Sequence, residues 1–397
     1  MRTRNFLALI IFLDLLFLLF GVHSLSISYN ESIIFYEGRG FLHYLVRFST
    51  YIFGQNDLAL RAPFILFHLL SIPLIYGISK FYLKKEDERL LSVVVFVLLP
   101  GVVSSALLVN SASVVIFFTL LFIYLFLHKR ENLYSLLLPL LVFVDNSFLV
   151  LYLSLFAYGI YSKNRYLSAL SAMLFLISLY LYGFGVHGKP RGYFLDTFGA
   201  YSLIFSPLIF LYFFYTMYRI FVRGEKSILW FISFVALVFS ILISFRQRII
   251  IEDYAPFVVI SIPLMVQLFL KSYRTRLPQL RKTHKVFFAL VFSFLILNFL
   301  ATYFNQYFYR FYESPKKHFA YKYHIAKELA SGLRAKGVTK VTSTDKRLLK
   351  RLNFYGIKES NEYKIEQHSS FSDPKSVTIS YINHPIISYS VTKVNSQ

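Results

Sequence analysis

The residues most able to do chemistry lie in the polar segment that follows the first apolar stretch of the chain. Two glutamates, Glu31 and Glu37, precede Arg39 in the sequence YNESIIFYEGRG. A carboxylate can accept the proton of a hydroxyl group, and a guanidinium can hold a phosphate through paired hydrogen bonds. A carboxylate at the depth of lipid headgroups costs free energy unless a cation or a metal ion pairs with it. The segment therefore predicts proton-transfer and phosphate chemistry, with a solvated loop in which both glutamates face water as the alternative.

The residues directly after this segment predict a helix that lies along a membrane surface. Apolar side chains stand at Phe41, Tyr44, Leu45, Phe48 and Ile52. This spacing gives an α-helix one apolar face, and it leaves Arg47 and Ser49 on a polar face. Such a helix would hold the two glutamates near the lipid phosphates.

The composition places this loop in a polytopic membrane protein. Of the 397 residues, 56% are hydrophobic and 16% are charged, whereas a soluble domain usually carries about 25% charged residues. The chain has no cysteine and a formal net charge of +22. These values exclude a disordered chain, a disulfide scaffold, a thiolate metal site and an ordinary soluble enzyme.

Hydropathy predicts eleven membrane-spanning segments. A bilayer core about 30 Å thick needs roughly 20 apolar residues in a helix. The windows that qualify are residues 6–22, 62–82, 90–109, 111–127, 166–185, 199–221, 227–244, 257–270 and 286–304. Residues 133–161 are long for one span and short for two, and we interpret them as a hairpin with Asp145 at its tip. The first window is expected to remain as an uncleaved helix, because no convincing signal-cleavage site follows it.

The distribution of Lys and Arg decides between this hairpin and a single span. With the hairpin and a cytoplasmic N-terminus, the inner loops hold 19 of these cations and the outer loops hold seven; with a single span the division becomes 12 against 14. Cytoplasmic loops carry the excess of positive charge in membrane proteins. The first division predicts a cytoplasmic N-terminus, an extracytoplasmic C-terminus and the plasma (inner) membrane. The cations of residues 271–285 then attract anionic membrane lipids, and no nucleic-acid partner is expected.

The composition changes after residue 304. Residues 1–304 form the predicted transmembrane domain, with a first outer loop at 23–61, and residues 305–397 form a small α/β domain on the outer face. The sequences YHIAKELASGLRAKGV and DKRLLKRLNFYGI predict helices, whereas VTKVTST, SVTISYI and SYSVTKVN predict strands. This domain keeps a net charge of +9 after the loop charges are assigned to topology.

The order of these features resembles the GT-C membrane glycosyltransferases, in particular glycosyltransferase family 39, which contains the protein O-mannosyltransferases and the aminoarabinose transferases acting on lipid A. In that family an Asp-Glu pair follows the first span, an interfacial helix comes next, and a segment like FGxxxxxxRxPxxL opens the second span. Here the pair is Asn30-Glu31 and the segment is FGQNDLALRAPFIL at 53–66. An amide thus replaces the acid usually taken as the catalytic base.

Further segments extend the resemblance over roughly residues 1–305. Residues 98–118 resemble the third and fourth spans of the family, whose outer turn often carries a second acid, and Asn110 stands at that position. The hairpin is similar to short helices that face the catalytic cavity, and RQRIIIEDYAP at 246–256 resembles a late Arg-Tyr-x-x-Pro element. The resemblance implies about 11 transmembrane helices in a GT-C-like arrangement, with an active-site cavity on the outer face beneath the C-terminal domain.

The resemblance also implies a reaction and roles for individual residues. Family members transfer a sugar, with inversion, from a polyprenyl-phosphate donor to an acceptor, here an envelope glycan, lipid or protein. Glu31 is the candidate base or metal ligand, with Glu37 second, and a divalent metal ion is a candidate cofactor. Arg39, Arg246 and Arg248 are candidates for holding the donor phosphate. The candidate cavity residues are Asn30, Asn110 and Asp145.

Alternatives remain for several of these assignments. Arg246 and Arg248 would also suit ordinary lipid headgroups, and Asp145 would also suit a turn that caps two short helices. The two amide replacements leave room for a non-catalytic membrane protein that binds or transports a lipid-linked glycan. Asp14, in the middle of the first span, leaves room for a secondary transporter in which this carboxylate couples the flux.

Overall fold

The chain forms two compact units in the computed structural model, which describes residues 2–183, 192–312, 314–368 and 376–394. The helical unit comprises Met1–Leu16 and Phe64–Leu300. The mixed unit comprises Phe17–Pro63 and Ala301–Gln397. This division differs from the predicted boundary at residue 304, because the segment between the first two spans packs on C-terminal elements.

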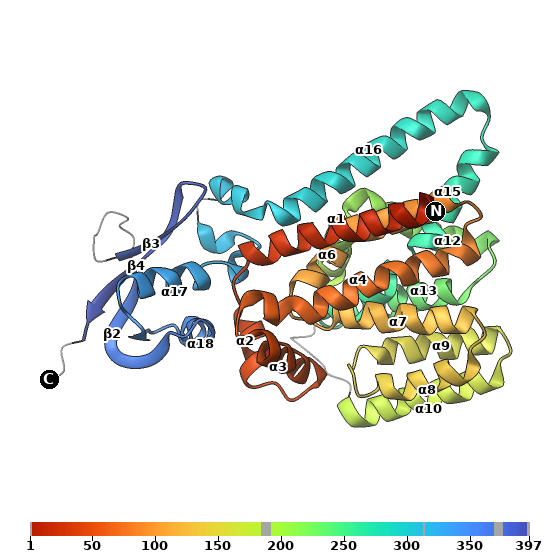
Figure 1. The fold of residues 1–397 in the computed structure, drawn as a ribbon. Helices are drawn as coiled ribbons and strands as arrows, with labels where there is room; N and C mark the ends of the chain where they lie inside the picture. The colour runs from red at the N-terminus through yellow and green to blue at the C-terminus, as the bar shows by residue number, and fades with distance from the viewer. Residues whose placement is uncertain (1, 184–191, 313, 369–375, 395–397) are drawn as a thin grey trace. The chain divides into compact units, whose positions relative to one another are not determined.

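Helices make up the helical unit (Figure 1). Three of them run from one unit into the other: α1 (Arg2–Ser24), α4 (Asp57–Tyr82) and α16 (Pro278–Tyr303). The others are α5 (Glu86–Leu98), α6 (Pro100–Leu107), α7 (Ala112–Leu127), α8 (Glu131–Leu141), α9 (Phe148–Tyr161), α10 (Arg165–Tyr182), α11 (Phe194–Phe205), α12 (Pro207–Arg223), α13 (Ile228–Ser244), the 3-10 turn η1 (Ile251–Asp253), α14 (Ala255–Val259) and α15 (Ile262–Thr275). Over the described residues, each predicted apolar window corresponds to one helix or to two adjoining helices.

Prolines divide two of the predicted spans into bent pairs. Helices α5 and α6 meet at 59°, and α11 and α12 meet at 106°. Pro100 and Pro207 each stand in the first turn of the second helix, where the missing N–H is tolerated. Proline cannot continue the preceding helix, because it has no N–H to donate. The predicted span over 199–221 therefore consists of two helices joined at a sharp bend.

Helix length gives fewer membrane crossings than the hydropathy windows predict. Among the described residues, five helices are long and apolar enough to cross a membrane, or seven if each bent pair counts as one span. Helices α7, α9 and α13 are apolar but shorter. The structure thus agrees with a polytopic membrane protein, and the count of eleven stays a prediction.

The predicted hairpin at 133–161 is confirmed as two short helices. Helix α8 has 11 residues and α9 has 14, and Asp145 lies in the turn that joins them. Helix α9 packs against α10 and α13. Neither helix of the hairpin has the roughly 20 residues that a full crossing needs.

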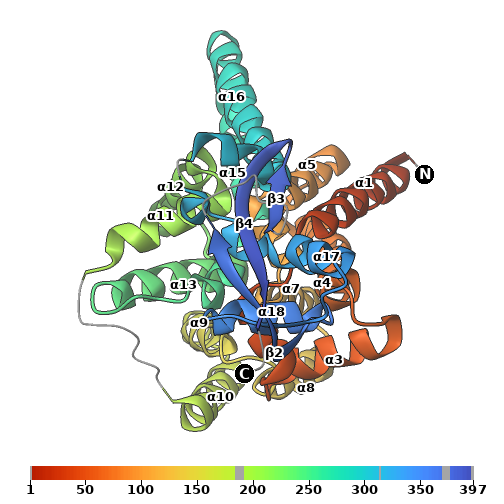
Figure 2. The same cartoon turned by 90° about the vertical axis from the view of Figure 1, so that its left-hand side faces the viewer.

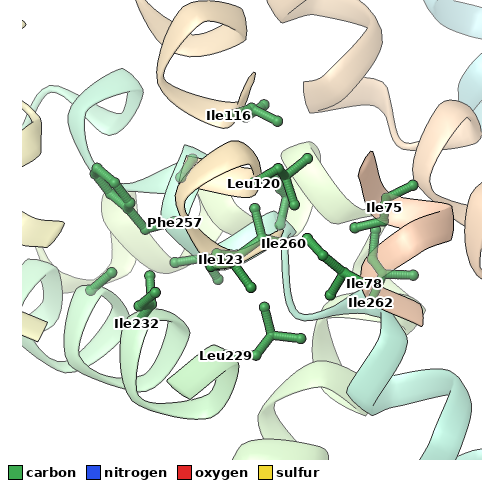
Figure 3. Packing of buried hydrophobic residues seen from close by; sticks show 14 of the residues in the cluster. Ile75, Ile78, Ile116, Leu120, Ile123, Leu229, Ile232, Phe257, Ile260 and Ile262 are labelled. Atoms are coloured by element: carbon green, nitrogen blue, oxygen red, sulfur yellow. The ribbon is translucent and has the colours of Figure 1, made fainter. Parts of the chain in front are cut away.

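Hydrophobic side chains from four parts of the chain form a portion of the core of the helical unit (Figure 3). They come from α4, α7, α13 and the α14–α15 segment, and the labelled ones are Ile75, Ile78, Ile116, Leu120, Ile123, Leu229, Ile232, Phe257, Ile260 and Ile262. Several buried serines in this unit donate to carbonyls one turn back, as Ser79 Oγ does to the Ile75 oxygen at 2.7 Å. Such bonds satisfy a hydroxyl that has no water to contact.

Some helices leave most of their apolar surface uncovered. The most apolar 18-residue window is 17% buried in Pro278–Tyr303 and 22% buried in Arg165–Tyr182, against 67% in Ala255–Thr275. Large side chains such as Leu176 and Tyr180 are exposed on α10. Exposed apolar patches of this size on a soluble protein would aggregate, whereas lipid tails solvate them well.

The mixed unit combines short helices with one sheet (Figure 2). Its first part contains α2 (Tyr29–Tyr36) and α3 (Phe41–Phe53). Its second part contains η2 (Asn305–Phe311), η3 (Pro315–Lys317), η4 (Tyr321–Tyr323), α17 (Ala326–Ala335), β1 (Lys340–Thr342), α18 (Lys346–Phe354), β2 (Lys358–His368), β3 (Ser376–Tyr381) and β4 (His384–Lys393). The strand order is β1-β2-β4-β3, in which β1 runs parallel to β2 and the other two pairs are antiparallel.

Helices α17 and α18 cover an apolar core on the sheet. Leu329 and Leu333 of α17, Leu352 of α18 and Ile365 of β2 are all fully buried in it. The helices and strands α17, β1, α18, β3 and β4 agree with the sequence prediction. Strand β2 was not predicted, because its sequence KESNEYKIEQH is mostly polar and exposed.

Candidate functional site

Glu31 stands in the first turn of α2, where it closes a capping box. The backbone N–H of Ser28 donates to Glu31 Oε2 at 2.7 Å, and the N–H of Glu31 donates to Ser28 Oγ at 3.2 Å. This reciprocal pair satisfies two N–H groups that the start of a helix leaves without helical partners. The spacing Ser-x-x-Glu in the sequence therefore fixes where α2 begins and directs the Glu31 side chain inward, so that it is only 2% exposed.

Arg61 is the cationic partner of Glu31. Its Nη2 lies 3.3 Å from Glu31 Oε2 and donates to the Ser26 oxygen at 3.1 Å. Its Nη1 lies 3.4 Å from Asp57 Oδ1, one turn earlier on α4. One fully buried guanidinium thus joins two buried carboxylates. We call Glu31, Asp57 and Arg61 the carboxylate–arginine cluster.

The sequence contains a pattern that indicates part of this cluster, although neither Asp57 nor Arg61 is among the candidate site residues. Asp57 and Arg61 both lie in the FGQNDLALRAPFIL segment, and they stand four residues apart, which places them on one face of a helix. The link from this pair to Glu31 spans 30 residues. Only the packing of α2 beside α4 reveals it.

The other candidates of the first loop lie apart from the cluster. Asn30 is exposed although its neighbour Glu31 is buried, since successive residues of a helix point about 100° apart. Glu37 caps the other end of α2 and forms an ion pair with Lys350. Arg39 is exposed in the loop that follows. Of the candidates in this loop, Glu31 is the one that the structure places in a buried polar environment.

Helix α3 is amphipathic as predicted; on its polar side Ser49 points inward, whereas Arg47 is exposed. Ser49 is buried and donates to the Ala59 oxygen at 2.6 Å. Phe48 is 65% exposed and Tyr51 is 89% exposed, in a row of aromatic and aliphatic side chains along the outward face. Arg47 covers the ring of Phe35 on α2. An exposed apolar face on a helix with inward hydrogen bonds is what a helix lying in a membrane interface needs.

Two candidates of the helical unit, Arg248 and Asn110, line cavities. One cavity of about 90 Å³ is lined by Arg248 together with Asn146, Ser147 and Asp253, among others. The other, of about 220 Å³, is lined by Asn110 and by segments of α6, α7, α11 and α14. Asn110 Oδ1 accepts from the N–H of Ala112 at 3.0 Å, so its amide caps the turn before α7. Arg246 is exposed. It stands two residues before Arg248 in the sequence, but it does not line the first cavity.

Asp145 belongs to a pair of carboxylates beside the smaller cavity. Its Oδ1 accepts from the N–H of Ser147 at 2.9 Å and also contacts the Ser147 hydroxyl. The same hydroxyl lies 3.2 Å from Asp253 Oδ1. Burial, together with the charge on Asp145, raises the pKa of Asp253 to about 7. A serine hydroxyl has one proton to donate, so a proton on Asp253 lets both contacts become hydrogen bonds.

Asp14 of the first span has a partner that hydropathy could not name. His68 Nε2 of α4 lies 2.7 Å from Asp14 Oδ2, and both side chains are buried. The His68 ring stacks on Phe96 of α5. An ionisable pair inside apolar helices is either structural or functional. Here the pair is local to three helices of the helical unit, and no cavity among those described reaches it.

A divalent metal ion finds a poor set of ligands in the described residues. No group of three or more His, Cys, Asp or Glu side chains converges there. The guanidinium of Arg61 already stands between the carboxylates of Glu31 and Asp57, where it supplies the positive charge that a metal ion would bring. The described residues therefore do not fit a metal site built by the protein alone.

Comparison with known protein families finds a match for the central part of the chain. Residues 41–209 match the family model of dolichyl-phosphate-mannose-protein mannosyltransferases. The resemblance to GT-C mannosyltransferases is confirmed. The matched residues begin at α3 and end in α12, so they include Asp57, Arg61, Asn110 and Asp145 but not Glu31. No curated protein matches the chain. The matched family consists of membrane glycosyltransferases, which agrees with the uncovered apolar helices.

Proposed function

We propose that the chain is a membrane glycosyltransferase that moves a sugar from a polyprenyl-phosphate donor to an envelope glycan, lipid or protein at the outer face, with inversion. The match of residues 41–209 to the mannosyltransferase family carries this proposal. The carboxylate–arginine cluster supports it, because the matched segment supplies Arg61, which is the partner of the candidate base Glu31.

The reaction needs a base and a cation that stabilises the leaving group. The Glu31 carboxylate takes the proton of the acceptor hydroxyl while the acceptor oxygen bonds to the anomeric carbon of the sugar. The bond from that carbon to the phosphate oxygen breaks with its electron pair, and the polyprenyl phosphate leaves with an added negative charge. Arg39, which lies in the same unit as Glu31, is the proposed phosphate ligand, because a guanidinium offers two parallel donors to phosphate oxygens. Arg246 and Arg248 stay predictions from the sequence.

The mixed unit supports the proposed topology. The loop between α1 and α4 packs with the C-terminal elements, so both lie on the same side of a membrane that these helices cross. An odd number of crossings, with the two termini on opposite sides, is consistent with this packing. Eleven crossings with a cytoplasmic N-terminus satisfy this condition. Helix α3, with its outward apolar face, adds a surface at which a lipid-linked donor can approach the loop.

One observation favours a second candidate function, a non-catalytic protein that binds a lipid-linked glycan. The Glu31 carboxylate is 2% exposed and already accepts bonds from the Ser28 N–H and from Arg61. A carboxylate that is used to cap a helix and to pair with a buried arginine has a sufficient structural role. The amides at Asn30 and Asn110 fit this candidate as well.

Transfer by the purified chain separates these two functions. The protein would be placed in lipid nanodiscs with polyprenyl-phosphate sugars and envelope acceptors, and wild type compared with Glu31→Gln. Because general base catalysis contributes about 10²–10⁴-fold, we expect the variant to lose at least about 100-fold in turnover while it still binds the donor lipid. Glu366→Gln, in an exposed ion pair with Lys364, is the control. Donor binding by wild type without any turnover would establish the non-catalytic candidate, and equal turnover by both proteins would exclude Glu31 as the base.

A further inference from the structure

The Asp57 carboxylate is held by side chains that lie far from it in the sequence. Besides Arg61, the Tyr355 hydroxyl at the end of α18 donates to Asp57 Oδ1 at 2.6 Å. Lys327 Nζ of α17 lies 3.2 Å from Asp57 Oδ2. Tyr355 and Lys327 belong to the C-terminal part of the mixed unit, about 300 residues from Asp57. The carboxylate that fixes one side of Arg61 is therefore itself fixed by the C-terminal part.

The backbone that precedes the cap of α2 is held from the same part. The guanidinium of Arg351, which is buried, donates from Nε to the Ile27 oxygen at 2.8 Å and from Nη2 to Ser26 Oγ at 3.2 Å. The N–H of Ile27 donates to the Tyr355 hydroxyl at 2.8 Å. Residues 26 and 27 stand directly before Ser28, the residue that binds the Glu31 carboxylate through its N–H.

Ser28 and Arg61, two partners of the Glu31 carboxylate, thus depend on C-terminal side chains. Arg61 is oriented through Asp57, which Tyr355 and Lys327 hold. Ser28 is oriented through residues 26 and 27, which Arg351 and Tyr355 hold. The Tyr355 hydroxyl takes part in both paths, since it donates to Asp57 and accepts from Ile27. A catalytic carboxylate needs a position fixed to within about 0.5 Å, which is the task of such supporting hydrogen bonds.

We propose that the C-terminal part of the mixed unit completes the Glu31 site, with Tyr355 and Lys327 as positioning residues for Glu31. This inference rests on the proposed function, in which Glu31 is the base. It assigns the C-terminal part a role in the reaction that the family match does not cover, because the match ends at residue 209.

The variant Tyr355→Phe distinguishes a role in positioning Glu31 from a role in attaching α18 to α2. Attachment of α18 to α2 also uses apolar packing, in which Phe354 meets Phe35 edge to ring with centroids 5.3 Å apart, and the Lys350–Glu37 ion pair. Tyr355→Phe leaves these contacts in place and removes only the hydroxyl. Lys327→Met removes one charge from Asp57, whereas Lys327→Arg keeps it.

The test compares these variants in the full-length protein in nanodiscs, with Tyr363→Phe as the control, since Tyr363 lies on β2 away from the cluster. Hydrogen exchange of residues 25–37 reports the order of the Glu31 segment, and kcat and KM for the polyprenyl-phosphate donor report the reaction. For Tyr355→Phe and Lys327→Met we expect faster exchange in this segment and about 10-fold lower kcat, with KM changed less than 2-fold. Lys327→Arg should keep most of the wild-type kcat.

Three results decide the matter. Exchange and kcat equal to those of Tyr363→Phe would overturn the proposal. A rise of kcat in Tyr355→Phe would overturn it too, because the C-terminal part would then obstruct Glu31 rather than position it. If wild type transfers no sugar, the proposed function fails, and the exchange of residues 25–37 alone decides whether Tyr355 and Lys327 hold the Glu31 segment.

Discussion

The imidazole of His68 lies 2.7 Å from the carboxylate of Asp14, and this contact joins α4 to α1 inside the apolar helices of the helical unit. Asp14 Oδ1 finds no hydrogen-bond partner within the part of the chain that the structure describes. Removing one member of a buried pair leaves an uncompensated polar group, whereas removing both replaces the pair by apolar packing. The pair therefore contributes to stability only as a unit.

We predict that His68→Leu destabilises the protein by about 3–5 kcal/mol, and that the double variant Asp14→Leu/His68→Leu recovers most of this loss. Thermal unfolding in detergent, followed by the fluorescence of the single tryptophan Trp230 in α13, measures both effects. Sugar transfer by the double variant should stay near the wild-type rate. Loss of substrate flux in a variant without Asp14 would instead support the alternative function, a secondary transporter in which Asp14 couples the flux.

Arg61 gives a second prediction, because its guanidinium balances two buried carboxylates. Arg61→Met leaves Glu31 and Asp57 with less opposing charge, and we expect a loss of about 3–5 kcal/mol in stability. Arg61→Lys should lose less, but a single ammonium cannot reproduce the fork that contacts Glu31, Asp57 and the Ser26 oxygen together. Unfolding temperatures measure the order wild type, Lys, Met.

The double variant Glu31→Gln/Arg61→Met serves as the control for this charge argument. It removes one carboxylate with the guanidinium, so it should be more stable than Arg61→Met alone. If the double variant is less stable than either single variant, the two residues stabilise the fold through separate contacts and the pairing has no energetic weight.

Local sequence signals predicted most helices but not their breaks. The apolar windows follow from composition alone, and the hairpin at Asp145 follows from the balance of Lys and Arg between the loops. The sequence analysis did not predict the 106° bend at Ser206, because a hydropathy window does not register that Pro207 must begin a new helix. Strand β2 was not predicted either, because its apolar contacts are few and its pairing partners β1 and β4 are separated from it by α18 and β3.

The candidate site shows a sharper limit. Glu31 was identified from its place in the loop and from a family resemblance, yet its partners were not. Arg61 lies 30 residues away, and Tyr355 lies 298 residues from Asp57. No local pattern relates residues at such distances, because the contacts form only when α2, α4 and α18 pack together. Sequence reasoning found the carboxylate, and the tertiary structure supplied the groups that hold it.

Asp253 predicts how the stability of the helical unit depends on pH. Its pKa is raised to about 7, chiefly by burial and then by the charge on Asp145, against 3.8 in the unfolded chain. Between these values the folded protein keeps a proton that the unfolded chain has lost. Stability should therefore fall as the pH rises from about 4 to about 7, by at most about 1.4 kcal/mol for each pH unit.

The comparison for this prediction uses Asp253→Asn, which keeps a hydrogen-bonding group but does not titrate. Its unfolding temperature, followed by Trp230 fluorescence, should vary less than that of wild type between pH 5 and 7. Asp87→Asn, at an exposed position in the first turn of α5, should follow wild type. A slope that is the same in all three proteins would show that Asp253 does not hold the proton.

His324 predicts the opposite pH dependence for the mixed unit. Burial, followed by the charges of His318 and Arg351, lowers the pKa of His324 to about 3, against 6.5 in the unfolded chain. Below pH 6.5 the unfolded chain binds a proton that the folded protein excludes, so stability falls as the pH drops from 6.5 toward 3, by about 1.4 kcal/mol for each pH unit from this residue. His324 Nδ1 lies 2.9 Å from the Tyr309 hydroxyl, and Tyr381 packs beside the same ring.

Hydrogen exchange of residues 305–394 at pH 5 and pH 7 measures this dependence separately from the helical unit. We expect wild type to exchange faster at pH 5 after correction for the intrinsic rate, and His324→Gln, which has no titrating group at this position, to show a smaller difference between the two pH values. His384→Gln, at an exposed position on β4, is the matched control and should behave as wild type. Because Asp253 acts in the other direction, a protein in which both units lose stability on acidification would contradict the assignment of the two groups.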